Sequence, residues 1–65
     1  MLTSLRRARL LREMSLYDLR ARTGISVSKL SLVERGIEQA SEEEKRRLSR
    51  ALGVQLQDLF PKGVD

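Results

Sequence analysis

Small and uncharged side chains, with two cations beside them, occupy residues 26–35, a pattern that suits contact with a polyanion. If this stretch is a helix, Leu30 and Val33 lie on its apolar face. The opposite side then carries a set of small or uncharged residues and the two cations: Val27, Ser28, Ser31 and Leu32, with Lys29 and Arg35 beside them. Small residues near a helix N-terminus let the backbone approach a DNA groove closely, and the partially positive amides there attract phosphate. The chemistry that this stretch predicts is recognition of an anion.

The side chains on which most catalysis and metal binding depend are missing. The 65 residues include no His and no Cys, which excludes an imidazole base, a thiol nucleophile, a disulfide and a His or Cys metal site. Acidic residues cluster only in Glu42–Glu44, a run that suits the positive end of a helix dipole. We therefore expect no catalytic residues, no metal, no cofactor and no enzymatic activity.

Charge is spread unevenly along the chain. The net charge is +4, but residues 1–33 carry seven basic and two acidic groups, whereas residues 34–65 carry six basic and seven acidic groups. A basic half favours an anionic partner such as nucleic acid or a membrane surface, although arginine-rich helix faces also occur where they meet only water. No membrane role is expected, because the only aromatic residues are Tyr17 and Phe60 and no apolar run approaches the roughly 20 residues of a span.

The helix start and stop signals in residues 1–65 predict a single all-α domain. The predicted helices are five short ones, at about 2–12, 15–22, 26–35, 41–52 and 55–60. Ser15 with Asp18 and Ser41 with Glu44 have the spacing of capping boxes, and Ser26 suits an N-cap.

The apolar residues of each predicted helix indicate its buried face. In the first helix they follow one another at a spacing of three: Leu2, Leu5, Ala8 and Leu11. In the second they are Leu16, Leu19 and Ala21, and in the fourth they are Leu48, Ala51 and Leu52. No stretch alternates with a period of two for long enough to predict a strand.

The second and third predicted helices have the spacing of a helix-turn-helix over residues 15–35. Gly24 lies in the short connection and allows the positive φ that a sharp turn needs. Ile25 is expected to pack inward and fix the angle between the helices. An ordinary αα-hairpin in a small bundle has the same loop length, so the spacing alone leaves both interpretations open.

The sequences of three stretches resemble those of the lambda-repressor/Cro-like (Xre-type) helix-turn-helix family. They are LRRARLLREMSLYDLRARTGIS, SKLSLVERG and LSRALGVQLQDLF, which together span most of residues 5–60. The resemblance implies a compact five-helix fold, binding to double-stranded DNA as a homodimer, and a role in transcriptional control in the cytoplasm, at the nucleoid of a prokaryote or in a phage-infected cell.

The resemblance also assigns roles to individual residues. It implies base contacts by Val27, Ser28 and Leu32, with apolar contacts from the first and last and a hydrogen bond from the serine. The expected contacts to the DNA backbone or its flanks are Arg12, Ser15, Leu16, Tyr17, Lys29, Ser31 and Arg35. Because Lys29 is the only candidate for a guanine edge, a larger share of specificity is expected from DNA shape.

Two further assignments concern structure and assembly. The resemblance pairs Arg9 with Glu34 in a largely buried ion pair between the first and third helices; the alternative is that both are independent surface residues. The candidate dimer surface consists of Ile37, Leu56, Phe60 and Val64. The last helix also suits simple closure of the core, with Leu56 and Leu59 inside and Phe60 shared.

Three residues depart from the family pattern. Leu16 stands where many relatives have a Gln that contacts the DNA backbone, Glu38 stands in a loop that is often basic, and Lys45 stands at a position that is usually aliphatic. The Leu16 and Glu38 departures favour an alternative function on the same fold, a protein-interaction module of antitoxin-like or co-regulator type with weak or partner-dependent DNA binding. Lys45 is expected to lay its stem over the core and keep its ammonium in water.

Overall fold

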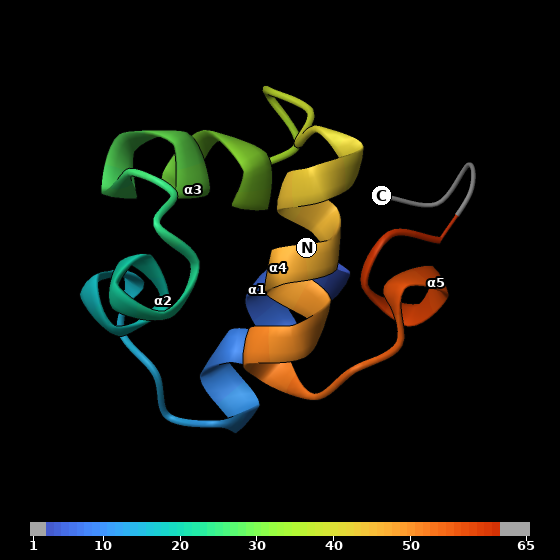
Figure 1. The fold of residues 1–65 in the computed structure, drawn as a ribbon, viewed down its shortest axis with the longest axis horizontal. Helices are drawn as coiled ribbons and strands as arrows, with labels where there is room; N and C mark the ends of the chain where they lie inside the picture. Colours follow the sequence, from blue (N-terminus) through green and yellow to red (C-terminus); the bar gives the residue numbers. More distant parts are fainter. Residues whose placement is uncertain (1–2, 62–65) are drawn as a thin grey trace.

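The computed structural model describes residues 3–61, and over this range the chain forms helices and no strand (Figure 1). The helices are α1 (Ser4–Leu11), α2 (Leu16–Thr23), α3 (Val27–Glu34), α4 (Glu42–Leu52) and α5 (Leu56–Leu59). The predicted all-α architecture is confirmed. Two residues of the predictions, Leu2 and Val64, lie outside the described range.

Serine caps begin three of the helices, as predicted. Ser15 Oγ accepts a hydrogen bond from the Asp18 N–H at 3.0 Å, and the Asp18 carboxylate accepts one from the Ser15 N–H at 2.9 Å. Ser41 and Glu44 form the same reciprocal pair, with distances of 3.1 and 2.8 Å. Ser26 Oγ accepts from the Lys29 N–H at 3.2 Å. These bonds satisfy amides that have no partner inside the helix, so they define where α2, α3 and α4 begin.

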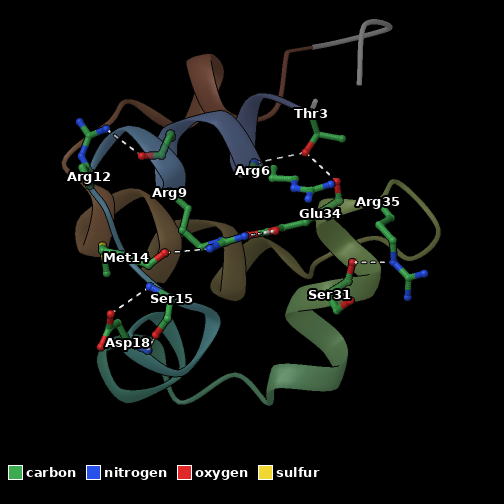
Figure 2. Close-up of polar contacts among 11 residues, drawn as sticks. Thr3, Arg6, Arg9, Arg12, Met14, Ser15, Asp18, Ser31, Glu34 and Arg35 are labelled. Atoms are coloured by element: carbon green, nitrogen blue, oxygen red, sulfur yellow. Dashed lines mark hydrogen bonds and ion pairs between the residues drawn. The ribbon is translucent and has the colours of Figure 1, made fainter. Parts of the chain in front are cut away.

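The cap of α1 was not predicted. Thr3 Oγ1 accepts a hydrogen bond from the Arg6 N–H at 3.2 Å and donates one to the Glu34 carbonyl at 2.7 Å. A single hydroxyl therefore caps α1 and ties its first turn to the last residue of α3 (Figure 2). The helix begins at Ser4, later than the predicted residue 2.

Each helix contributes at least one leucine to the centre of the core. Six leucine side chains are at most 2% exposed, two of them in α4: Leu5, Leu19, Leu30, Leu48, Leu52 and Leu59. Leu11 was expected beside Leu5, and this expectation is wrong, because the Leu11 side chain is 74% exposed. At about 100° per residue, steps of three rotate backwards around a helix, so Leu11 lies about 120° away from Leu5. Ala21 is exposed for the same kind of reason, since it lies about 160° from Leu19.

The turn between α2 and α3 has the predicted geometry. Gly24 adopts φ +76° and ends α2, and its N–H donates to the Arg20 carbonyl at 2.8 Å. Ile25 follows it into the core at 5% exposure. Thr23 is also buried, and its hydroxyl donates to the Leu19 carbonyl at 2.7 Å while accepting from the Ile25 N–H at 3.2 Å. The turn is therefore held from both sides, which gives α3 a defined direction relative to α2 (Figure 1).

Candidate nucleic-acid interface

The outer face of α3 carries small side chains over a firmly anchored inner face. Leu30 is fully buried, and Val33 is 8% exposed. Among the residues that were expected to contact bases, Ser28 is exposed, whereas Val27 and Leu32 are half-buried. Because no long side chain stands between Ser28 and solvent on its own helix turn, the backbone of α3 is open to close approach there.

The beginning of α2 offers main-chain donors more than side-chain donors. Ser15 and Tyr17 are exposed, the latter at 70%, but Leu16 packs against the core and is half-buried. A contact between Leu16 and a phosphate would therefore involve its amide and not its side chain. The first-turn amides of a helix carry partial positive charge, so this helix end still suits an anion.

An ion pair between Arg9 and Glu34 sets the position of α3 relative to α1. Arg9 Nε lies 2.5 Å from Glu34 Oε2, and Arg9 Nη2 lies 3.0 Å from Glu34 Oε1. The third guanidinium nitrogen, Nη1, donates to the Met14 carbonyl at 2.8 Å. The two side chains are 11% and 4% exposed. The predicted buried pair is confirmed, and the alternative of two independent surface residues is wrong (Figure 2).

Lys29, the cation of α3 with the expected reach to DNA, is held by carboxylates of its own chain. Its Nζ lies 3.0 Å from Glu44 Oε1 and 4.0 Å from Glu38 Oε1. The Glu44 carboxylate also accepts from the Ser41 N–H, and this hydrogen bond, followed by the bond from Lys29, holds the pKa of Glu44 below its usual value. Glu38 was noted as a departure in the sequence, but the part played by Glu44 was not anticipated. A phosphate or guanine contact by Lys29 competes with these two carboxylates for the ammonium.

Two arginines at the edges of the site, Arg12 and Arg35, each use one guanidinium N–H group within the domain, and their other N–H groups can bond solvent or a ligand. Arg12 Nη1 donates to the Ala8 carbonyl at 3.2 Å, and Arg35 Nε donates to the Ser31 carbonyl at 3.3 Å. Both guanidinium groups are exposed, and each lies beyond the end of its helix (Figure 2). Ser31 itself is half-buried, and its carbonyl is what positions Arg35.

The candidate dimer residues differ in exposure. Ile37 is 65% exposed in the loop after α3, whereas Leu56 and Phe60 are half-buried. Leu56 was expected inside the core and is only partly covered, while Leu59 is buried as expected. Lys45 Nζ lies 5.3 Å from the centre of the Phe60 ring and 3.8 Å from Glu42 Oε1, and its side chain is 24% exposed. The ammonium was expected in water, and it lies instead over an aromatic ring and near a carboxylate.

Residues 3–61 lack two other classes of site. No group of three or more acidic side chains there is arranged to hold a metal ion. No helix in the same range is both long and apolar enough to cross a bilayer.

Comparison with known proteins agrees with this geometry. A family model described as a helix-turn-helix domain matches residues 3–60, which include all five helices. Searches of curated proteins and of solved structures give no significant match. The match runs across the α2–turn–α3 unit and the three helices that support it, and the order of these helices is that of lambda-repressor-like domains. The chain therefore belongs to the helix-turn-helix domain family of DNA-binding domains.

Proposed function

We propose that this domain is a sequence-specific transcriptional regulator that binds duplex DNA by inserting α3 in the major groove. The observation that carries the proposal is the division of α3 into an anchored inner face and an open outer face. Leu30 and the Arg9–Glu34 ion pair hold the helix, while Ser28 stands exposed on the other side. A helix held this way presents its N-terminal turns to base edges without reorganising on binding.

Each part of the surface suits one component of the duplex. Val27 and Leu32 can contact thymine methyl groups, and Ser28 can donate to or accept from a base edge. The first-turn amides of α2, with the arginines at positions 12 and 35, suit the phosphates on either side of the groove. Because α3 provides no free long polar side chain on this face, much of the specificity is expected from DNA shape.

A homodimer is part of the proposal. Two recognition helices about 34 Å apart would enter successive major grooves of an inverted repeat. The described domain is 28 Å along its longest axis, so two adjacent copies can meet this spacing. Exposed Ile37 and half-buried Phe60 are the apolar residues from which the contact would be built. Sedimentation equilibrium of the wild type and of Ile37→Glu tests this part, and a wild type that stays monomeric on its operator would contradict it.

The decisive experiment is selection from a random duplex library at about physiological salt, followed by sequencing. We expect enrichment of an inverted repeat with half-site centres about 10 bp apart. The proposal would be rejected if no sequence is enriched and the protein also fails to bind duplex DNA at low salt.

The variant Ser28→Glu tests the position of α3 in the complex. Its carboxylate would face the groove, and we expect binding to the selected duplex to weaken by at least about a hundredfold, because like charges in an interface cost several kcal/mol. The matched control is Gln57→Glu, which adds the same charge at an exposed position of α5. Both variants should unfold at nearly the wild-type temperature. Equal affinity of the two variants would show that α3 is not the recognition helix.

A second candidate function has one observation in its favour. Because Lys29 is already paired with Glu44 and Glu38, the recognition helix has less free positive charge than its sequence indicates. The same fold could then serve as a protein-interaction module with weak or partner-dependent DNA binding. Salt separates the two functions, because a complex with six to ten phosphate contacts loses about 10³–10⁵ in affinity between 50 and 200 mM salt.

A further inference from the structure

Four arginines outside α3, with Glu43 among them, form a basic surface. We call this surface the arginine patch and define it as Arg22 at the end of α2 with Arg46, Arg47 and Arg50 of α4. The three arginines of α4 share one face with Glu43, because positions three, four and seven residues apart lie together on a helix. All of these side chains are exposed.

Glu43 shows how this surface holds a carboxylate. Its Oε1 lies 3.3 Å from Arg46 Nη2, and its Oε2 lies 3.2 Å from Arg47 Nε and 3.8 Å from Arg50 Nη2. Hydrogen bonds from Arg46 and then Arg47 keep the pKa of Glu43 below its usual value. Hydrogen bonds with Ser15 lower the pKa of Asp18 most, and the nearby charge of Arg22 lowers it further. Two carboxylates cannot neutralise four guanidinium groups, so the patch keeps an excess of positive charge that a further anion can meet.

A shallow, open pocket of about 540 Å³ lies where α2 ends against α4. Its lining consists of Arg22, Thr23, Arg47, Arg50 and Ala51. The Thr23 carbonyl oxygen is among the last of α2, and it accepts only a long bond of 3.5 Å, from Arg47 Nη1. Carbonyls in the last turn of a helix have no partner within the helix. The pocket thus combines guanidinium donors for an anion with a main-chain acceptor that a ligand N–H can satisfy.

We propose that the arginine patch is a docking surface for an acidic segment of a partner protein. A carboxylate of that segment binds in the pocket between Arg22, Arg47 and Arg50, and a main-chain N–H of the same segment donates to the Thr23 carbonyl. Guanidinium groups bind carboxylates through paired, charge-assisted hydrogen bonds. The carbonyl decides between two classes of partner, because a peptide carries donors whereas a phosphodiester backbone carries only acceptors. No patch residue belongs to α3 or to the first turn of α2, the elements proposed to contact DNA.

The probe is a short blocked peptide of alternating glutamate and alanine, added to the ¹⁵N-labelled protein while amide shifts are followed by NMR. We expect the largest shifts at residues 22–23 and 47–51, and none of that size in α3. A glutamine-alanine peptide of equal length is the neutral control. A random-sequence duplex is titrated in parallel, and we expect it to shift α3 and the start of α2. This comparison keeps the docking proposal separate from the proposed DNA binding, since either can fail without the other.

Variants give the sharper test, because they predict changes in both directions. The double variant Arg47→Gln, Arg50→Gln should weaken peptide binding at least about tenfold, the effect of losing one charge-assisted hydrogen bond. Its matched control is Arg6→Gln, Arg7→Gln, two exposed arginines of α1 outside the pocket, and this variant should remain within about twofold of wild type. Glu43→Gln should strengthen binding, because it removes the carboxylate that competes for the same guanidinium groups.

Several outcomes would overturn the docking surface. These are an unchanged affinity in the Arg47, Arg50 double variant, an equal loss in the α1 control, weaker binding by Glu43→Gln, or equal shifts from the neutral peptide. Duplex shifts concentrated on the arginine patch would instead identify a nucleic-acid site there and reject the acidic segment. The variants change exposed ion pairs that contribute little to folding, so helical circular dichroism should confirm that each is folded before binding is measured.

Discussion

Replacing Arg9 by alanine is expected to remove most of the stability of this domain. The guanidinium donates to both carboxylate oxygens of Glu34 and to the Met14 carbonyl, and the Glu34 side chain is only 4% exposed. Arg9→Ala therefore leaves a buried carboxylate without its partner, at a cost of about 3–5 kcal/mol. A core of this size supplies only about 3–5 kcal/mol, so we expect the variant to be largely unfolded at room temperature.

The assay is urea unfolding followed by circular dichroism, with Arg6→Ala as the control. Arg6 is an exposed arginine of the same helix, and its replacement should change the free energy of unfolding by less than about 0.5 kcal/mol. The double variant Arg9→Met, Glu34→Leu should recover most of the lost stability, because apolar side chains of similar volume strand no charge. Equal effects of Arg9→Ala and Arg6→Ala, or no recovery in the double variant, would refute the reasoning.

Two other predictions concern the turn and the helix caps. Gly24→Ala should lower the free energy of unfolding, measured by urea unfolding, by about 1–2 kcal/mol. The added Cβ would have no atom within 4 Å, so the whole cost is the strain of a non-glycine residue at φ +76°. An unchanged free energy of unfolding would mean that the turn relaxes. Acid should destabilise the domain, because folding lowers the pKa values of Asp18, Glu43 and Glu44. The stability that these carboxylates contribute is fully present above their unfolded pKa values and is lost as the pH falls through their folded pKa values. Urea midpoints from pH 7 to pH 3 should fall less steeply in Glu44→Gln than in the wild type, and identical curves would contradict this.

The parts of the fold that sequence predicts well are those decided by local chemistry. Both capping boxes are found where they were expected, because in each a serine stands three residues before an acidic residue and directly ahead of a helix, so that each side chain can bond the other's N–H. Gly24 and Ile25 are equally local, since the first must accept a left-handed conformation and the second follows it into the core. The Arg9–Glu34 pair spans 25 residues and came from the family resemblance, not from local pattern.

The parts that sequence predicts poorly depend on how the helices are rotated and what lies across from them. Leu11 matches a spacing of three, but the buried face of α1 consists of Leu5, Ala8 and Arg9. Leu11 lies off this face and is exposed to solvent. Thr3 lacks the acidic or amide residue three positions later that marks a capping box, and its second bond goes to a helix more than 30 residues away. Neither fact follows from the residues next to it in the chain.

Charge in space differs from charge along the chain, and the difference changes which surfaces meet an anion. Two cations of the basic first half, Arg9 and Lys29, are paired with Glu34 and Glu44 of the second half, so they add little to an external field. The arginine patch takes three of its four members from that second half, which has a net negative sum. Adding charges by segment therefore misses part of the basic surface, because ion pairs between distant helices cancel some cations of the first half and the arginine patch lies mostly in the half with a negative sum. After pairing, α3 meets a polyanion through its small side chains and its backbone, and the arginine patch, whose guanidinium groups outnumber its carboxylates, lies at α4 and the end of α2.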